Sequence, residues 1–241
     1  MFALENFSSF RNNKTILNSI SFELKTGSIS VLLGKNGAGK SSLALSLMGH
    51  PAYNTSGRAY LFGVNLLELP IHERSKIGFF LSFQAPYEIP GVKTITFLYE
   101  MCRAHGQLYD SIEQFQEVVR KYIRLLKLQE SLLHRELNVG FSGGEKKQFE
   151  LLQLFLLKPA FVILDEPDSG LDVDKIQILC DALITLRQEN PNIIILLITH
   201  YQKLLENIVP DKVFVMEQGK IILSGNYEIA EEIFQQGYDN V

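Results

Sequence analysis

Residues 33–43 read LGKNGAGKSSL, and this stretch decides the fold. It matches the pattern G-x-x-x-x-G-K-[ST], with Gly34, Gly39, Lys40 and Ser41 at the fixed positions. Glycines let the backbone curl so that successive N–H groups point at phosphate oxygens. A lysine and a hydroxyl at this spacing can reach the β- and γ-phosphates and a Mg²⁺ ion, respectively. The stretch therefore predicts a loop that binds nucleotide phosphates.

The segments on either side of this loop favour the same interpretation. Residues 29–33 (ISVLL) are apolar and β-branched, as in a buried parallel strand, and residues 41–50 (SSLALSLMGH) have helical spacing. A helix N-terminus next to the loop adds partial positive charge for an anion. The motif alone would also fit a glycine-rich turn that binds nothing. The residues that we expect to contact the nucleotide here are Gly34, Lys35, Asn36, Gly37, Ala38, Gly39, Lys40, Ser41 and Ser42.

Length and composition limit the classes of protein to consider. A chain of 241 residues fits one large α/β domain, or one with an inserted subdomain. Its net charge of −4 gives no indication of a nucleic-acid surface. Two distant cysteines fit a reduced, cytosol-like compartment, and the longest apolar run (193–198) is too short to cross a bilayer. The first ten residues lack the features of a signal peptide, so we expect any work at a membrane to depend on a partner.

Two adjacent acids follow a short apolar run further along the chain. Residues 161–164 (FVIL) precede Asp165 and Glu166. Acids at the end of a buried strand are costly unless they bind a cation or polarise a reactant. In a protein with a phosphate loop, the first acid reaches the Mg²⁺ ion and the second can orient the attacking water as a general base. The alternative is that both acids are simply exposed at the strand end.

Three further side chains are placed to meet a nucleotide. Gln84 follows the apolar segment 78–83, and His200 follows the apolar segment 192–199. Carboxyl ends of strands in α/β sheets face the ligand crevice, so Gln84 could bind Mg²⁺ or water and His200 could meet a γ-phosphate. Phe10 could stack on a purine ring, although it could equally be a core residue of an edge strand.

Residues 140–145 (GFSGGE) form a second turn suited to phosphate. Ser142 could cap the helix that follows, and Gly143 and Gly144 would let a phosphate approach its N-terminus. Because the chain already has one phosphate loop, this turn is either an ordinary cap or serves a phosphate held by another subunit. Between the two turns, residues 94–137 have helical spacing with few strand signals, which indicates an inserted helical subdomain.

In this order, these elements resemble an ABC-type ATPase over essentially the full length of the chain. They correspond to Walker A (34–41), the Q-loop (Gln84), the signature (141–145), Walker B (161–165) with the catalytic glutamate (Glu166), the D-loop (169–172) and the switch histidine (His200). Six elements in the right order are a specific match.

Within that family the chain is most similar to SufC-type ATPases of the Suf iron–sulfur cluster assembly machinery. The stretches that carry this resemblance are 48–53, 79–92, 140–147, 168–172 and 199–213. Transport ATPases usually have Gln in place of Glu145 and Ala in place of Gly170. Pro167, Gln148 and Phe149 depart from the common SufC pattern.

The resemblance implies an α/β fold with a mixed sheet core, an antiparallel β subdomain and a helical subdomain. It implies a catalytic core over 1–93 and 138–241, with 94–137 as the helical part. It further implies ATP as substrate and Mg²⁺ held by Ser41, Gln84 and Asp165. Lys40, Gln84, Glu166 and His200 would carry out catalysis.

The resemblance also implies partners. Two copies would close head to tail on ATP, with Ser142, Gly143 and Gly144 of one copy facing the phosphate loop of the other. SufB- and SufD-like scaffold proteins would be the stable partners, in the cytoplasm or, for a plastid-encoded chain, in the plastid stroma. We expect no nucleic-acid partner and no direct membrane insertion. The alternatives are the nucleotide-binding subunit of a membrane transporter and a scaffold that binds nucleotide without hydrolysing it.

Overall fold

The computed structural model describes residues 1–83 and 86–238. This part of the chain divides into two compact units. The first unit comprises Met1–Ser82, Pro159–Pro167 and Asn190–Val241, and the second comprises Phe83–Lys158 and Asp168–Glu189. Every helix within the described ranges is too short or too polar to cross a bilayer.

Six described strands form the central sheet of the first unit. In spatial order they are β12 (Lys220–Gly225), β11 (Lys212–Glu217), β3 (Ile29–Leu33), β10 (Ile194–Ile198), β9 (Phe161–Asp165) and β6 (Phe79–Ser82). All neighbours are parallel except β12, which is antiparallel to β11. Strands β3, β9 and β10 are buried at every residue, which explains their unbroken apolar sequences. The predicted buried strand at 29–33 is confirmed.

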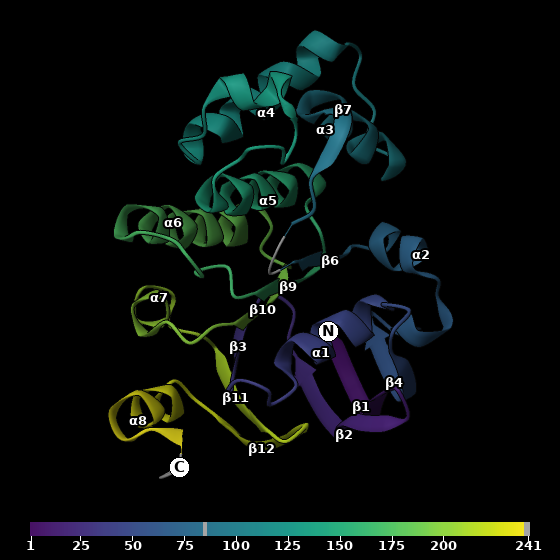
Figure 1. Cartoon of the computed structure of the whole chain (residues 1–241), viewed down its shortest axis with the longest axis vertical. Coiled ribbons are helices and arrows are strands. Elements are labelled where there is room, and N and C mark those ends of the chain that lie inside the picture. The colour runs from purple at the N-terminus through teal and green to yellow at the C-terminus, as the bar shows by residue number, and fades with distance from the viewer. Residues whose placement is uncertain (84–85, 239–241) are drawn as a thin grey trace. The chain divides into compact units, whose positions relative to one another are not determined.

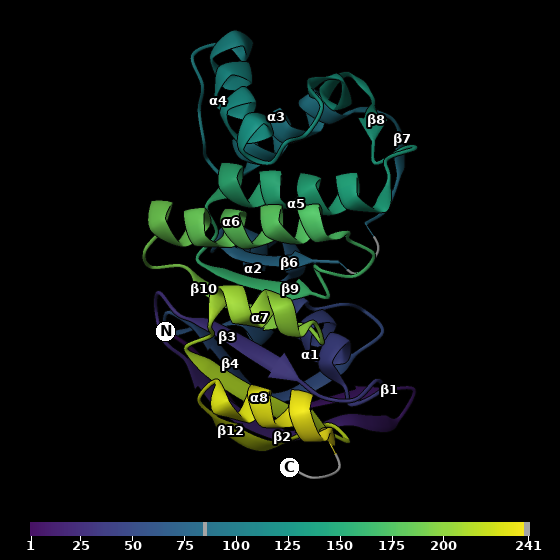
Figure 2. The ribbon, with the colours of Figure 1, turned by 90° about the vertical axis from the view of Figure 1, so that its left-hand side faces the viewer.

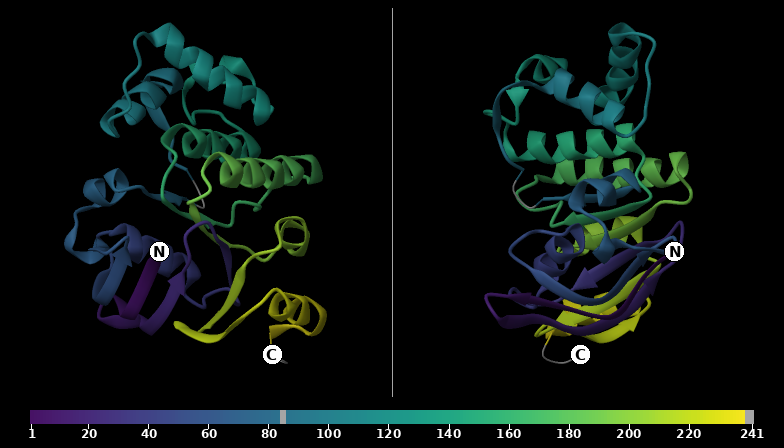
Figure 3. Two further views of the ribbon diagram at one scale, coloured as in Figure 1. Left: turned by 180° about the vertical axis from the view of Figure 1, so that it is seen from behind. Right: turned by 90° about the vertical axis from the view of Figure 1, so that its right-hand side faces the viewer.

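Four described strands form a second, antiparallel sheet. Their spatial order is β2 (Lys14–Leu24), β1 (Phe2–Arg11), β4 (Asn54–Leu61) and β5 (Val64–Asn65). This sheet and α1 (Lys40–Met48) lie on one face of the central sheet, whereas α7 (Gln202–Ile208) and α8 (Glu228–Gln236) lie on the other (Figures 1 and 3). Alternate residues of β9, Phe161 and Ile163, therefore enter one hydrophobic core with Phe2 and Leu4 of β1. The predicted fold class, a mixed sheet core with an antiparallel β subdomain and helices, is confirmed.

The segment between β5 and β6 is less exposed than its polar sequence suggests. It forms a short 3₁₀ turn, η1 (Leu66–Glu68), and helix α2 (Ile71–Lys76). Arg74 of α2 is buried, because its guanidinium donates to the backbone oxygens of Leu47 at 2.6 Å and Leu69 at 2.9 Å. These bonds give the buried guanidinium N–H groups acceptors, and the bond to Leu47 joins α2 to the end of α1.

Helices dominate the second unit. They are α3 (Thr94–Ala104), α4 (Ile112–Leu125), α5 (Gly143–Leu157) and α6 (Val173–Glu189), with the short 3₁₀ helix η2 (Glu130–His134). Helices α5 and α6 lie side by side (Figure 2). Helix α4 packs through Phe115, Val119, Tyr122 and Ile123, one face of a helix. The Tyr122 ring stacks on Phe155 of α5 at 4.8 Å.

Residues 86–92 contain two prolines and a glycine, a composition typical of an irregular loop, yet part of this stretch forms a strand. β7 (Ile89–Lys93) pairs antiparallel with β8 (Glu136–Leu137). Pro90 is tolerated within β7 because a two-stranded ribbon leaves one side of each strand without a ladder. The predicted helical subdomain, 94–137, falls inside the second unit, which also contains α5 and α6. Its boundaries as a separate subdomain stay a prediction.

We predict that Phe161→Ala lowers the free energy of unfolding by about 3 to 5 kcal/mol, because it leaves a cavity in an aromatic stack. The Phe161 ring lies 4.3 Å from that of Phe2 and 5.0 Å from that of Phe79, and all three are buried. Urea denaturation followed by circular dichroism measures the loss. Ile222→Ala, at a side chain 51% exposed, is the control and should cost less than about 1 kcal/mol. Equal losses in the two variants would contradict the role of the stack.

Candidate functional site

The candidate residues of the first unit follow neighbouring strands at one edge of the central sheet. Strand register places Leu32 of β3 beside Ile198 of β10, and Ile198 beside Asp165 of β9. The phosphate loop, His200 and Glu166 therefore all leave the sheet at its carboxyl edge. Ligands of open α/β sheets bind at this edge.

The Lys40 side chain is enclosed by the loop that it follows. Lys40 is 5% exposed, and its ammonium group donates to the backbone oxygens of Gly34 at 2.6 Å and Lys35 at 3.2 Å. Burial lowers the pKa of Lys40, while the negative charges of Glu166 and Asp165 act in the opposite direction. One cation and two acids thus share an electrostatic environment before any ligand is bound.

The two glycines of the motif are required by the backbone around them. Gly34 has a φ of +152°, and a Cβ atom there would lie 2.2 Å from the backbone oxygen of Met216. Gly39 has a φ of +111°, which side chains rarely adopt. The turn between β11 and β12 supports the loop, since the N–H of Gly219 donates to the oxygen of Ala38 at 2.8 Å. The loop is therefore held in shape by a distant hairpin.

The remaining loop residues are accessible to a ligand. Lys35, Asn36 and Gly37 are exposed, and Ser41 and Ser42 are half-buried in the first turn of α1. The N-terminus of α1 adds partial positive charge at this place. The geometry fits the predicted binding of phosphate, and each residue's contact with nucleotide stays a prediction.

The two acids differ in their surroundings. Asp165 ends β9 and is 5% exposed, whereas Glu166 is half-buried and has a φ of +49°. The N–H of Glu166 donates to the oxygen of Ile198 at 2.8 Å, which holds it in this left-handed conformation. Backbone strain of this kind is concentrated at functional sites. The Ser41 hydroxyl and the Asp165 carboxylate supply the oxygen donors that Mg²⁺ prefers.

His200 has a neighbour that no sequence motif indicates. Its Nδ1 atom lies 3.3 Å from the hydroxyl oxygen of Tyr238, and the two rings meet edge to face with centroids 6.4 Å apart. The same hydroxyl oxygen accepts a hydrogen bond from the N–H of Gly34 at 3.2 Å. Tyr238 therefore touches both the start of the phosphate loop and the candidate switch histidine.

Two other candidates are less well defined. Phe10 is half-buried in β1, opposite Asn54 of β4, within the antiparallel sheet. Its stacking on a purine stays a prediction. Gln84 lies outside the described residues, so its contacts with Mg²⁺ or water also stay predictions.

In the second unit, Ser142 begins α5 with a capping box. The Ser142 side chain accepts from the N–H of Glu145 at 3.2 Å, and the Glu145 carboxylate accepts from the N–H of Ser142 at 2.7 Å. The predicted cap is thus confirmed. A Cβ atom on Gly144 would lie 2.5 Å from the Lys175 ammonium. Glycine at this position therefore allows Lys175 of α6 to pack against the turn. A cavity of about 330 Å³ opens beside it, lined in part by Ser142 and Asp172.

Helix α5 also holds the residue that precedes Gln84. The N–H of Phe83 donates to Glu150 at 3.0 Å, and its backbone oxygen accepts from the Lys147 ammonium at 3.1 Å. The side chains of Lys147 and Glu150 are 8% and 7% exposed and lie 3.9 Å apart. The backbone N–H and C=O groups of Phe83 are therefore both fixed by a buried ion pair, whose residues lie two and five positions after the signature in α5.

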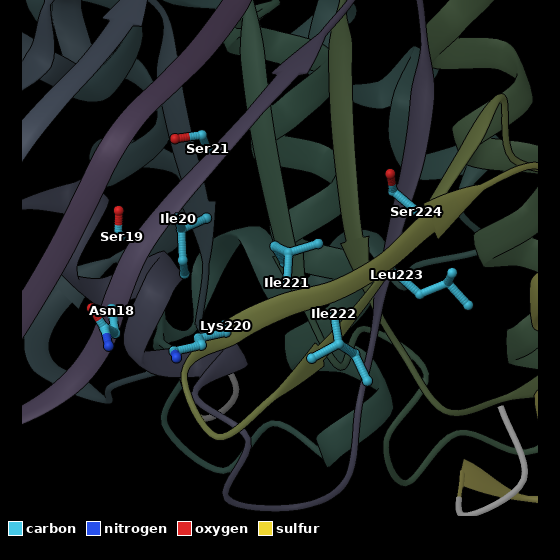
Figure 4. Close-up of a pocket in the computed structure, with 9 residues that line it drawn as sticks. All are labelled: Asn18, Ser19, Ile20, Ser21, Lys220, Ile221, Ile222, Leu223 and Ser224. Carbon is cyan, nitrogen blue, oxygen red and sulfur yellow. The ribbon is translucent and has the colours of Figure 1, made fainter.

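A further groove in the first unit lies away from these residues. It measures about 530 Å³ and is lined by residues 18–21 of β2 and 220–224 of β12 (Figure 4). None of its lining residues belongs to the candidate set. It is therefore not the predicted nucleotide site.

Comparisons with known proteins agree with this arrangement. The sequence profile described as ABC transporter matches residues 17–169. A probable ATP-dependent transporter of Synechocystis sp. is 40% identical over 242 residues, covering 98% of this chain and 94% of that protein. A second probable ATP-dependent transporter, from Pyropia yezoensis, is 43% identical over 231 residues, covering 93% and 91%.

Among solved structures, a dimeric ATP-binding cassette in a post-hydrolysis state, bound to ADP and Pi, superimposes with a TM-score of 0.80. The match covers 94% of this chain and 98% of that one at 16% identity, a level at which the likeness shows the shared fold alone.

We predict that Ser142→Asp folds normally yet turns over ATP about 100-fold more slowly or worse. Aspartate is as good a helix cap as serine, but its charge repels an approaching phosphate. Ser142→Ala should instead lower the free energy of unfolding by about 1 kcal/mol, because the cap is lost. Thermal unfolding and steady-state ATPase assays separate the two effects. Wild-type turnover in Ser142→Asp would mean that this turn is only a helix cap.

Proposed function

The chain belongs to the ABC transporter family and is an ABC-type ATPase, and we propose that it drives iron–sulfur cluster assembly as the ATPase subunit of a SufBCD-like complex. The observation that carries the ATPase part is the meeting of Lys40, Asp165 and Glu166 at one edge of the central sheet. The assembly part rests on the stretches 79–92 and 199–213, which resemble SufC-type chains.

In the proposed mechanism, Lys40 binds the β- and γ-phosphates of ATP. Its ammonium group now donates to two backbone oxygens of the loop, and phosphate oxygens replace them as acceptors when ATP enters. Backbone N–H groups of the exposed loop residues 35–37 and the N-terminus of α1 would bind the remaining phosphate charge. Positioning and charge neutralisation are the main sources of catalysis in phosphoryl transfer.

Ser41, Asp165 and Gln84 would hold Mg²⁺ beside these phosphates. When bound, the ion neutralises charge that develops on the transferred phosphoryl group. Glu166 would orient the attacking water as general base, and its constrained backbone would limit the positions that the carboxylate can adopt. His200 would donate a hydrogen bond to the γ-phosphate.

The signature turn would act on a nucleotide held by a second copy. Ser142, Gly143 and Gly144 begin a helix of 15 residues whose N-terminus suits a phosphate, yet the chain already has its own phosphate loop. We propose that two copies bind head to tail, each completing the other's site. The solved ATP-binding cassette described above is itself dimeric.

A second candidate function is the nucleotide-binding subunit of a membrane transporter. The relatives from Synechocystis sp. and Pyropia yezoensis are named as probable ATP-dependent transporters, which favours this candidate. Glu145 and Gly170 favour the assembly role, because transport ATPases usually have glutamine and alanine there. Hydrolysis is the same in both candidates, so only the partner distinguishes them.

Purification from native cells tests the assembly role. We expect a tagged chain, isolated without detergent, to retain SufB- and SufD-like proteins from a soluble cytosolic or stromal fraction. Adding those proteins back should raise its ATPase rate. Recovery only from detergent-solubilised membranes, with a partner that spans the membrane several times, would overturn the assembly role. The chain would then be the nucleotide-binding subunit of a transporter.

We predict that Glu166→Gln traps a dimer with bound ATP. The amide keeps the size of the side chain but cannot accept a proton from water, so ATP binds and closes the dimer without being hydrolysed. Light scattering with ATP and Mg²⁺ measures the oligomeric state. Glu117→Gln, at an exposed position of α4, is the control and should behave as wild type. A Glu166→Gln chain that stays monomeric with ATP would rule out the shared site.

A further inference from the structure

Tyr238 has two hydrogen-bond partners among the described residues, and their chemistry differs. The backbone N–H of Gly34 can only donate, so at 3.2 Å the phenol oxygen accepts from it. The other partner is His200 Nδ1 at 3.3 Å, and a neutral imidazole nitrogen can either donate or accept. A phenol has a single hydrogen to give. Within the described chain, the acceptor available for it is His200 Nδ1.

We infer that Tyr238 is a positioning residue that holds His200 in the tautomer with its proton on Nε2. A neutral imidazole carries one proton, so when Nδ1 accepts from the Tyr238 hydroxyl, Nε2 is the nitrogen that donates. The inference rests on the proposed contact between His200 and the γ-phosphate. That contact needs a donor, because phosphate oxygens are acceptors.

The protonation state of the phenol agrees with a donor role. Burial raises the pKa of Tyr238, and the hydrogen bond from Gly34 opposes this rise. An ordinary tyrosine titrates near pH 10. A higher pKa keeps the hydroxyl protonated throughout the neutral range.

The contact also joins three segments that are distant in sequence. Gly34 follows β3, His200 follows β10, and Tyr238 follows α8, which ends at Gln236. Gly34 is buried, and a Cβ atom there would lie 2.2 Å from the backbone oxygen of Met216, so it is closely packed. The Tyr238 hydroxyl is thus attached to a closely packed residue of the phosphate loop, and it orients His200, which is exposed.

Tyr238→Phe tests this inference, because it removes one oxygen and keeps the ring. We expect long-range ¹H–¹⁵N spectra of the imidazoles to show wild-type His200 as the Nε2–H tautomer alone. The signal is assigned by its loss in His200→Gln. In Tyr238→Phe the same signal should show a mixture of tautomers. An Nδ1–H tautomer in the wild type, or an unchanged tautomer in the variant, would overturn the inference.

Kinetics supply the second measurement. We expect kcat of Tyr238→Phe to fall about three- to tenfold, the worth of one hydrogen bond, with the KM for ATP changed less than about twofold. Tyr227→Phe, before α8, should match the wild type in both constants. A raised KM with unchanged kcat would mean that Tyr238 only supports the phosphate loop. Unchanged turnover in His200→Ala would instead refute the proposed role of His200, independently of the tautomer spectra.

Discussion

The burial of a lysine ammonium group inside the phosphate loop is the interaction on which the rest of the first unit depends. A buried cation is costly unless it is hydrogen-bonded and faces opposite charge. Two loop carbonyls and the nearby acids Glu166 and Asp165 provide both. The acids arrive there because β9 is separated from β3 only by β10, in a sheet whose strands run parallel. Strand order thus brings one cation and two acids that are distant in sequence into one site.

The second unit is built around α5 in a comparable way. Its first turn carries the signature residues, and Lys147 and Glu150 then hold the backbone of Phe83. A displacement of this helix would therefore move the signature turn and the start of the Q-loop together. Such a link would suit the proposed function, in which closure on ATP is communicated to a partner.

Much of the first unit could be predicted from the sequence, because its signals are local. A glycine pattern, an unbroken apolar strand or a pair of acids can be recognised within ten residues, and Gly34, Lys40 and Asp165 lie where these patterns predict. Contacts between distant segments carry no such signal. Tyr238 meets His200 only because α8 packs beside the central sheet. The polar sequence around Arg74 predicts an exposed side chain, but its hydrogen bonds to the backbone oxygens of Leu47 and Leu69 allow it to be buried. Strand β7 is not recognisable from its own sequence, because it contains a proline and a glycine, and it forms by pairing with β8.

Complementation between two inactive variants tests the shared site most directly. Lys40→Ala disables the phosphate loop of a chain, and Ser142→Asp disables its signature turn. In a head-to-tail dimer of one chain of each kind, one site contains both defects and the other contains neither. An equimolar mixture should therefore recover roughly a quarter of wild-type ATPase activity, since about half of randomly formed dimers are mixed and each has one intact site. A mixture as inactive as either variant alone would show that each chain works with its own signature turn, contrary to the shared site proposed here.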